Sequence, residues 1–112
     1  MITIKNFYQP FFSEYLIQKV WEKALVIENI DPGIYRLDNC GALIKNAFYL
    51  KEYKALSTGW GIDLIKPKSK GGTDELSNLQ ALQWENKEAK GESYPLWKCI
   101  ISRDNKGNYY LK

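Results

Sequence analysis

The chain has 112 residues and a net charge of +3, and its composition is 45% hydrophobic and 14% aromatic. This length predicts a single domain spanning residues 1–112, and the apolar content excludes a disordered chain. The charge is too small to indicate a dedicated DNA-binding domain. No apolar run approaches the ~20 residues that span a bilayer, and the N-terminus lacks the apolar core of a signal peptide, so we expect a cytoplasmic protein with no membrane partner.

Histidine is absent from the sequence, and there are two cysteines, Cys40 and Cys99. The chain therefore lacks the commonest general base at neutral pH and the commonest transition-metal ligand. Two cysteines are too few for a closed zinc site, which takes four nitrogen or sulfur ligands. In a reducing compartment free thiols are the favoured state of Cys40 and Cys99, and a disulfide between them is the alternative.

The N-terminal third predicts a helix followed by a strand pair. Apolar residues recur at helical spacing within residues 11–27, and Ser13 is well placed as the N-cap. Asp31-Pro32-Gly33 is typical of a turn. Short extended segments are expected at 34–37 and 42–49.

The rest of the chain predicts a strand, a loop, a strand, a short helix and a hairpin. The two strands are expected at 60–65 and 76–82, with a glycine-rich basic loop at 68–73 between them. The helix is expected at 84–90, with Gly91 placed to end it. The C-terminal region, 97–112, is expected to form a hairpin, whose strands we place at 96–102 and 108–111.

The segment from Gly59 to Gln80, GWGIDLIKPKSKGGTDELSNLQ, resembles the HNH endonuclease family. The family pattern there is an Asp-His pair on a first strand, then Ile-x-Pro, a Gly-Gly-x-Asp loop, and Asn-Leu-Gln on a second strand. Residues 84–86 (WEN) and 90–92 (KGE) resemble the helix that closes the family's ββα-metal fold.

The specific core of this likeness is residues 59–92, and a weaker similarity to a bacterial subgroup of the family extends over residues 20–99. The resemblance implies an α+β fold with an HNH-like ββα-metal core. An N-terminal helix at 11–27 and additional β-hairpins complete the expected architecture.

The resemblance also implies roles for individual residues, and two of the positions are altered. Asp63 matches the family's metal-binding aspartate, and Asn78 matches its central asparagine. Leu64 stands where the family has its general-base histidine, and Lys87 stands where the helix supplies a metal ligand. Leucine accepts no proton, and a charged lysine only donates hydrogen bonds, so neither residue can play the family's role. We therefore expect no cofactor. Mg²⁺ or Mn²⁺ would bind at Asp63 only if the site is still competent. A shift of one residue in the helix register would make Asn86 the ligand instead.

Lys87 allows two interpretations. Its ammonium group would either occupy the place of the missing cation and pair with Asp63, or point to solvent. On the first interpretation, Leu64→His combined with Lys87→Asn should restore metal binding.

Lysines in and near the basic loop predict a groove that follows phosphates. Lys66, Lys68 and Lys70 alternate along the loop, and Lys90 follows on the helix. Basic side chains in such a row bind nucleic acid through its backbone charge. An ordinary solvated loop is the alternative.

Three functions are compatible with these residues. The first, which we favour because of Leu64 and Lys87, is a catalytically inactive HNH-like domain, a pseudoenzyme retained for nucleic-acid or protein binding. The second is an active metal-dependent HNH endonuclease that cleaves DNA phosphodiester bonds. The third is a nuclease-derived inhibitor or immunity-type interaction protein. DNA and a protein are accordingly the two candidate partners.

Overall fold

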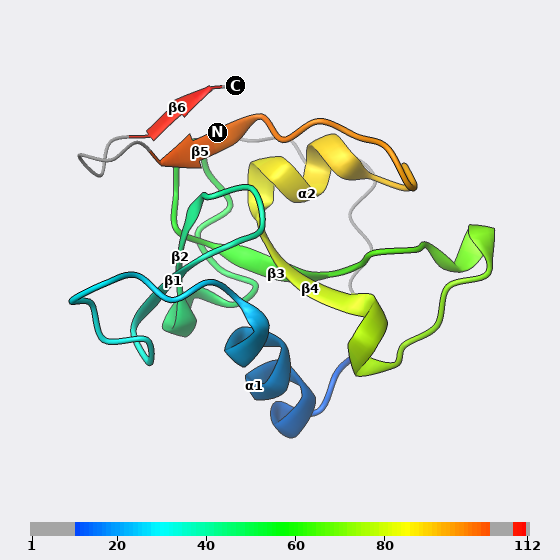
Figure 1. The fold of residues 1–112 in the computed structure, drawn as a ribbon, viewed down its shortest axis with the longest axis horizontal. Helices are drawn as coiled ribbons and strands as arrows, with labels where there is room; N and C mark the ends of the chain where they lie inside the picture. Colours follow the sequence, from blue (N-terminus) through cyan, green and yellow to red (C-terminus); the bar gives the residue numbers. More distant parts are fainter. Residues whose placement is uncertain (1–10, 104–108, 112) are drawn as a thin grey trace.

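The computed structural model describes residues 11–103 and 109–111, with side chains for residues 11–102. Within these residues it is a small mixed α+β domain, which confirms the predicted class (Figure 1). The helices are α1 (Glu14–Lys23) and α2 (Trp84–Lys90). The antiparallel strand pairs are β1 (Tyr35–Leu37) with β2 (Leu43–Lys45), β3 (Trp60–Leu64) with β4 (Leu79–Gln83), and β5 (Ile101–Arg103) with β6 (Tyr109–Leu111).

Helix α1 begins directly after the expected N-cap and is shorter at both ends than the predicted range of 11–27. The Ser13 hydroxyl accepts a hydrogen bond from the backbone N–H of Leu16 at 3.2 Å, which confirms the expected N-cap. The helix ends at Lys23 instead of residue 27. The reason is tertiary, because Leu25 exchanges two backbone hydrogen bonds with Leu37 and is therefore extended.

The β3–β4 pair has one apolar face and a second face that carries Asp63 and Gln80 beside Gly61 and Leu82. Side chains alternate along a strand, and the register places Asp63 directly opposite Gln80. The apolar face packs against α1, where the rings of Trp21 and Trp60 lie 5.4 Å apart. Its members are Trp60, Ile62, Leu79 and Ala81. Figure 1 shows α2 on the opposite side of the pair from α1, over the face that carries Asp63 and Gln80.

The loop between β3 and β4 needs both of its adjacent glycines. Gly71 has a φ of +92°, a left-handed conformation that glycine adopts without strain. Gly72 lies against the backbone of Lys66, so that a Cβ at position 72 would be 1.6 Å from the Lys66 carbonyl oxygen. The Gly-Gly pair is thus required by the shape of this loop.

Several predicted strands are shorter in the structure. Residues Leu76–Asn78 form a 3₁₀ turn before β4, and Asn46–Phe48 form another directly after β2. β5 begins only at Ile101, and the predicted turn at 104–107 lies outside the described residues. At the start of β5, the backbone N–H groups of Ile100 and Ile101 donate to the Asn86 side chain on α2.

The expectation of free thiols is wrong in this structure. Cys40 and Cys99 form a disulfide, with their Cα atoms 5.6 Å apart and a sequence separation of 59 residues. The pairing depends on the approach of two distant segments, which the spacing of cysteines does not reveal. A bridge closing a loop of this size stabilises a fold by about 2–4 kcal/mol.

Neither helix in the described ranges is long and apolar enough to cross a bilayer.

Candidate functional site

The candidate site centres on the carboxylate of Asp63, which is buried and bonded to neighbouring side chains. Its Oδ2 atom accepts a hydrogen bond from Gln80 Nε2 at 2.9 Å and lies 3.3 Å from the ammonium nitrogen of Lys90. Asp63 is 3% exposed and Lys90 is 2% exposed. The same ammonium group donates to the carbonyl oxygen of Leu64 at 2.9 Å. A buried ion pair, with its hydrogen bonds made, therefore occupies the position that the motif assigns to a metal ligand.

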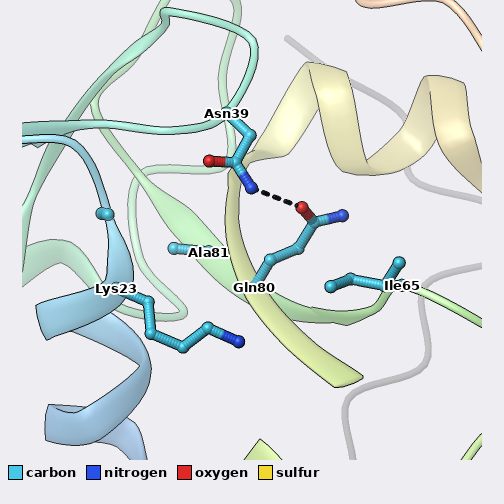
Figure 2. Close-up of a pocket in the computed structure, with 6 residues that line it drawn as sticks. Lys23, Asn39, Ile65, Gln80 and Ala81 are labelled. Atoms are coloured by element: carbon cyan, nitrogen blue, oxygen red, sulfur yellow. Dashed lines mark hydrogen bonds between the residues drawn. The ribbon is translucent and has the colours of Figure 1, made fainter. Parts of the chain in front are cut away.

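The side-chain amide of Gln80 connects Asp63 to Asn39. Its Oε1 atom accepts a hydrogen bond from Asn39 Nδ2 at 2.8 Å (Figure 2). The two amides line a pocket of about 40 Å³, together with Lys23, Ala24, Ile65 and Ala81. Figure 2 shows Lys23 reaching from α1 toward this pocket, and its ammonium group donates to the carbonyl oxygens of Leu76 and Leu79. Such a volume holds a few water molecules at most and excludes a nucleotide.

Lys87 adds a second positive charge to the site. It lies three residues before Lys90 on α2, so the two lysines share the helix face toward Asp63. Lys87 is partly exposed, in contrast to Asp63 and Lys90. Burial lowers the pKa of Lys87; the charge of Asp63 opposes this shift, and that of Lys90 adds to it. Burial raises the pKa of Asp63, while the Gln80 hydrogen bond and the charges of Lys87 and Lys90 offset part of that rise.

These positions revise two expectations about the lysines. The cation-replacement hypothesis named Lys87 alone as the partner of Asp63, whereas the structure adds Lys90 in direct contact. Lys90 was also expected in a phosphate-binding groove. Its burial against Asp63 and Leu64 corrects that expectation, since its ammonium group is not available at the surface.

Leu64 and Asn78 have structural roles. The Leu64 side chain packs against the apolar core on the side of α1, so no proton acceptor stands at the family's general-base position. Asn78 donates to the carbonyl oxygens of Lys66 and Thr73 at 3.0 and 2.7 Å, and its Oδ1 accepts the N–H of Lys66 at 2.9 Å. Asn78 therefore holds the loop between β3 and β4 in shape.

Asn86 belongs to a separate buried network and is not placed as a metal ligand. It is fully buried, and its Nδ2 donates to Asp38 Oδ2 at 3.1 Å and to the Ile101 carbonyl at 3.0 Å. Its Oδ1 accepts the N–H groups of Ile100 and Ile101. Because these bonds engage both ends of the amide, the alternative in which Asn86 binds an ion has no support from its geometry.

Asp38 is the hub of that network, and the functional reading of the sequence missed it. Its buried carboxylate also accepts the backbone N–H groups of Cys40, Ala42 and Gln83 at 2.8–2.9 Å. Burial raises the pKa of Asp38, and the surrounding N–H donors offset part of that rise. The Asp-Asn-Cys-Gly turn was the available signal, since an aspartate that begins a turn commonly accepts backbone N–H groups two to four residues on.

The basic loop keeps only part of its predicted positive charge. Lys68 pairs with Asp74 at 2.9 Å, and both side chains are about half exposed (53% and 48%). Lys70 is exposed and Lys66 partly exposed. The Ser69 hydroxyl donates to Glu92 at 3.0 Å, which places the loop beside the end of α2 but also brings a negative charge to it. We define Lys66, Lys70 and Lys87 as the basic face.

The residues around Asp63 do not fit a divalent ion. The carboxylate oxygen Oδ2 and the Leu64 carbonyl oxygen are both occupied by the Lys90 ammonium group. Within the described ranges, no three His, Cys, Asp or Glu side chains gather where they could hold a metal. A hard cation such as Mg²⁺ requires several oxygen ligands, and here a lysine competes for them.

Comparison of the chain with protein-family models, with curated proteins and with solved structures gives no match. The likeness to HNH endonucleases therefore rests on the motif at residues 59–92.

Proposed function

We propose that this chain is a catalytically inactive HNH-like domain that binds nucleic acid. The observation that carries the proposal is the buried pair of Asp63 and Lys90, in which a protein ammonium group contacts the carboxylate that would otherwise face a metal ion. Leu64 supplies no general base beside it. The loss of a general base alone costs about 10²–10⁴ in rate.

The order of elements supports the HNH-like part of the proposal. The motif predicts a strand with Asp63, a glycine-containing loop, a strand after Asn78 and a short helix. The chain forms β3, the loop, β4 and α2 in that order. Asn78 braces the loop, as the resemblance implies for that position.

The basic face supports nucleic acid as the ligand. Lys66 and Lys70 lie on a loop that contacts the end of α2, and Lys87 lies on α2 itself. Lysine side chains on such neighbouring segments attract a phosphate backbone without reading its sequence. The Cys40–Cys99 disulfide does not support the expected cytoplasmic setting, because disulfides are rare in cytosolic proteins.

The first prediction is that the protein binds DNA without cutting it. A labelled DNA duplex should show a mobility shift at low salt that weakens as NaCl is raised, because released counterions drive the binding. Supercoiled plasmid incubated with the protein and Mg²⁺, Mn²⁺ or Ni²⁺ should stay intact. Lys70→Gln should make the salt dependence shallower, whereas Lys19→Gln should not, because Lys19 lies on α1, across the sheet.

The other two functions give different results in the same assays. Metal-dependent nicking of the plasmid would show an active endonuclease. An absence of any shift at low salt would favour a protein partner and the inhibitor-type function.

A further inference from the structure

The segment that leads into β3 is held in a strained backbone conformation. Leu50, Glu52 and Leu56 have φ angles of +56°, +58° and +57°, which lie in the left-handed region. This region is disfavoured for residues other than glycine, because the Cβ atom approaches the following carbonyl oxygen. Such residues are uncommon in proteins, yet three of them occur here close together. Contacts with the rest of the fold must therefore hold the segment in place.

Side chains at the start of α2 make those contacts with residues 51–57, which we call the strap. Three consecutive residues, Gln83, Trp84 and Glu85, bond to the strap backbone at Ser57, Lys51 and Leu56, respectively. The Gln83 amide and the Trp84 indole N–H donate to carbonyl oxygens at 3.1 and 2.6 Å, and Glu85 Oε1 accepts a backbone N–H at 2.5 Å. The bonds reach both ends of the strap, so α2 fastens it along its whole length.

The strap covers an aromatic side chain. Tyr53 stacks on Trp84, with their ring centroids 4.3 Å apart and their planes inclined by 18°. Trp84 is 0% exposed and Tyr53 is 41% exposed, so the tyrosine lies on the solvent side of this stack. Gly59 permits the close packing, because a Cβ there would lie 2.0 Å from the Lys51 carbonyl oxygen and 2.5 Å from Trp84 Nε1.

The two ends of the strap are attached to strands instead of to α2. The Leu50 N–H donates to the Trp60 carbonyl oxygen at 2.9 Å, directly before the strap. The Thr58 carbonyl oxygen accepts the Lys45 N–H at 2.9 Å, directly after it. The bonds to α2 can therefore break while both ends stay fixed and the strands stay paired.

We infer that the strap is a lid that opens as a unit, with the rest of the domain folded, and uncovers the Trp84 side chain. Opening breaks the bonds to α2 and the ring stack, and it releases the backbone strain at Glu52 and Leu56. It therefore needs less free energy than unfolding of the β3–β4 pair, as is typical of segments that open locally. No strap residue belongs to the site at Asp63 or to the basic face, so strap opening is independent of the proposed function.

The test is hydrogen exchange of the Trp84 indole N–H, followed by NMR in the full chain, with its disulfide intact, at increasing urea. A local opening exposes little surface, so this exchange should depend weakly on urea and be faster than that of the β3 and β4 amides. Glu85→Ala should speed the exchange at Trp84 about tenfold, because it frees the opposite end of the strap at Leu56. Glu14→Ala, which removes the acidic residue in the first turn of α1, should not change it.

A second set of variants tests the strain. Leu56→Gly and Leu56→Ala both remove a side chain that is 49% exposed, but glycine alone adopts the left-handed conformation freely. Exchange at Trp84 should therefore be at least about threefold slower in Leu56→Gly than in Leu56→Ala. Ala55→Gly, at the neighbouring position outside the left-handed region, should not slow it.

Three results would overturn the inference. The Trp84 indole N–H could exchange with the same rate and urea dependence as the β3 and β4 amides, which would mean that the strap opens only when the whole domain unfolds. Equal exchange in Leu56→Gly and Leu56→Ala would show that no strain is released on opening. An unchanged rate in Glu85→Ala would show that α2 does not fasten the strap as a unit. None of these results bears on DNA binding, which the mobility-shift assay tests separately.

Discussion

Replacing Lys90 with methionine is expected to lower the free energy of unfolding by about 3–5 kcal/mol, because it removes the ammonium group in direct contact with a buried carboxylate. The Asp63 side chain is 3% exposed and would keep the hydrogen bond from Gln80 and the more distant charge of Lys87. The Leu64 carbonyl oxygen would lose its donor as well. Urea denaturation, followed by tryptophan fluorescence, measures the loss.

Two controls separate the buried pair from an ordinary salt bridge. Lys68→Met removes an ion pair with a shorter distance, 2.9 Å to Asp74, but that pair is exposed and should contribute at most about 1 kcal/mol. Adding Asp63→Asn to Lys90→Met should recover most of the stability, since the uncompensated charge is gone. Equal losses for Lys90→Met and Lys68→Met would contradict the buried pair.

Asn86→Ala is expected to lower the free energy of unfolding by about 2–6 kcal/mol. Two backbone N–H groups, those of Ile100 and Ile101, would lose their acceptor, and the Asp38 carboxylate would lose a donor. Each buried polar group left without a partner costs about 1–3 kcal/mol. The same denaturation experiment measures this loss.

The matched control for Asn86 is Asn39, whose amide donates a single described hydrogen bond, to Gln80. Asn39→Ala should cost about 1 kcal/mol. If both alanine variants have the same stability, Asn86 is not the centre of a buried network. In that case its side chain would again be available for the ligand role that the shifted helix register gives it.

Local signals in the sequence predicted much of the fold. The Ser13 cap, the apolar spacing along α1 and the glycine after α2 depend on residues within a few positions of each other. The Gly-Gly loop was also visible, because close backbone approach and a left-handed conformation both require glycine. The element order β3, β4, α2 followed from these signals.

Contacts between segments that are far apart in the chain could not be predicted from the sequence. The early end of α1 depends on Leu25 meeting Leu37, and the disulfide depends on Cys40 meeting Cys99. In the candidate site, Lys87 alone was predicted as a partner of Asp63, although helical spacing places Lys90 on the same face of α2. Which of them contacts Asp63 depends on how α2 lies over the sheet, and only the structure gives that.

The contact between Lys90 and Asp63 also changes the expected result of engineering the site. Leu64→His with Lys87→Asn restores the family residues but leaves the Lys90 ammonium group against the carboxylate. Removal of Lys90 is therefore a further requirement for binding a metal ion there.

The most direct test of the account is a crystal structure of the wild-type protein grown with Mn²⁺, with anomalous scattering used to locate the ion. We expect the Lys90 ammonium group in contact with Asp63 and no anomalous peak at that carboxylate. A manganese ion bound to Asp63, with Lys90 displaced, would contradict it.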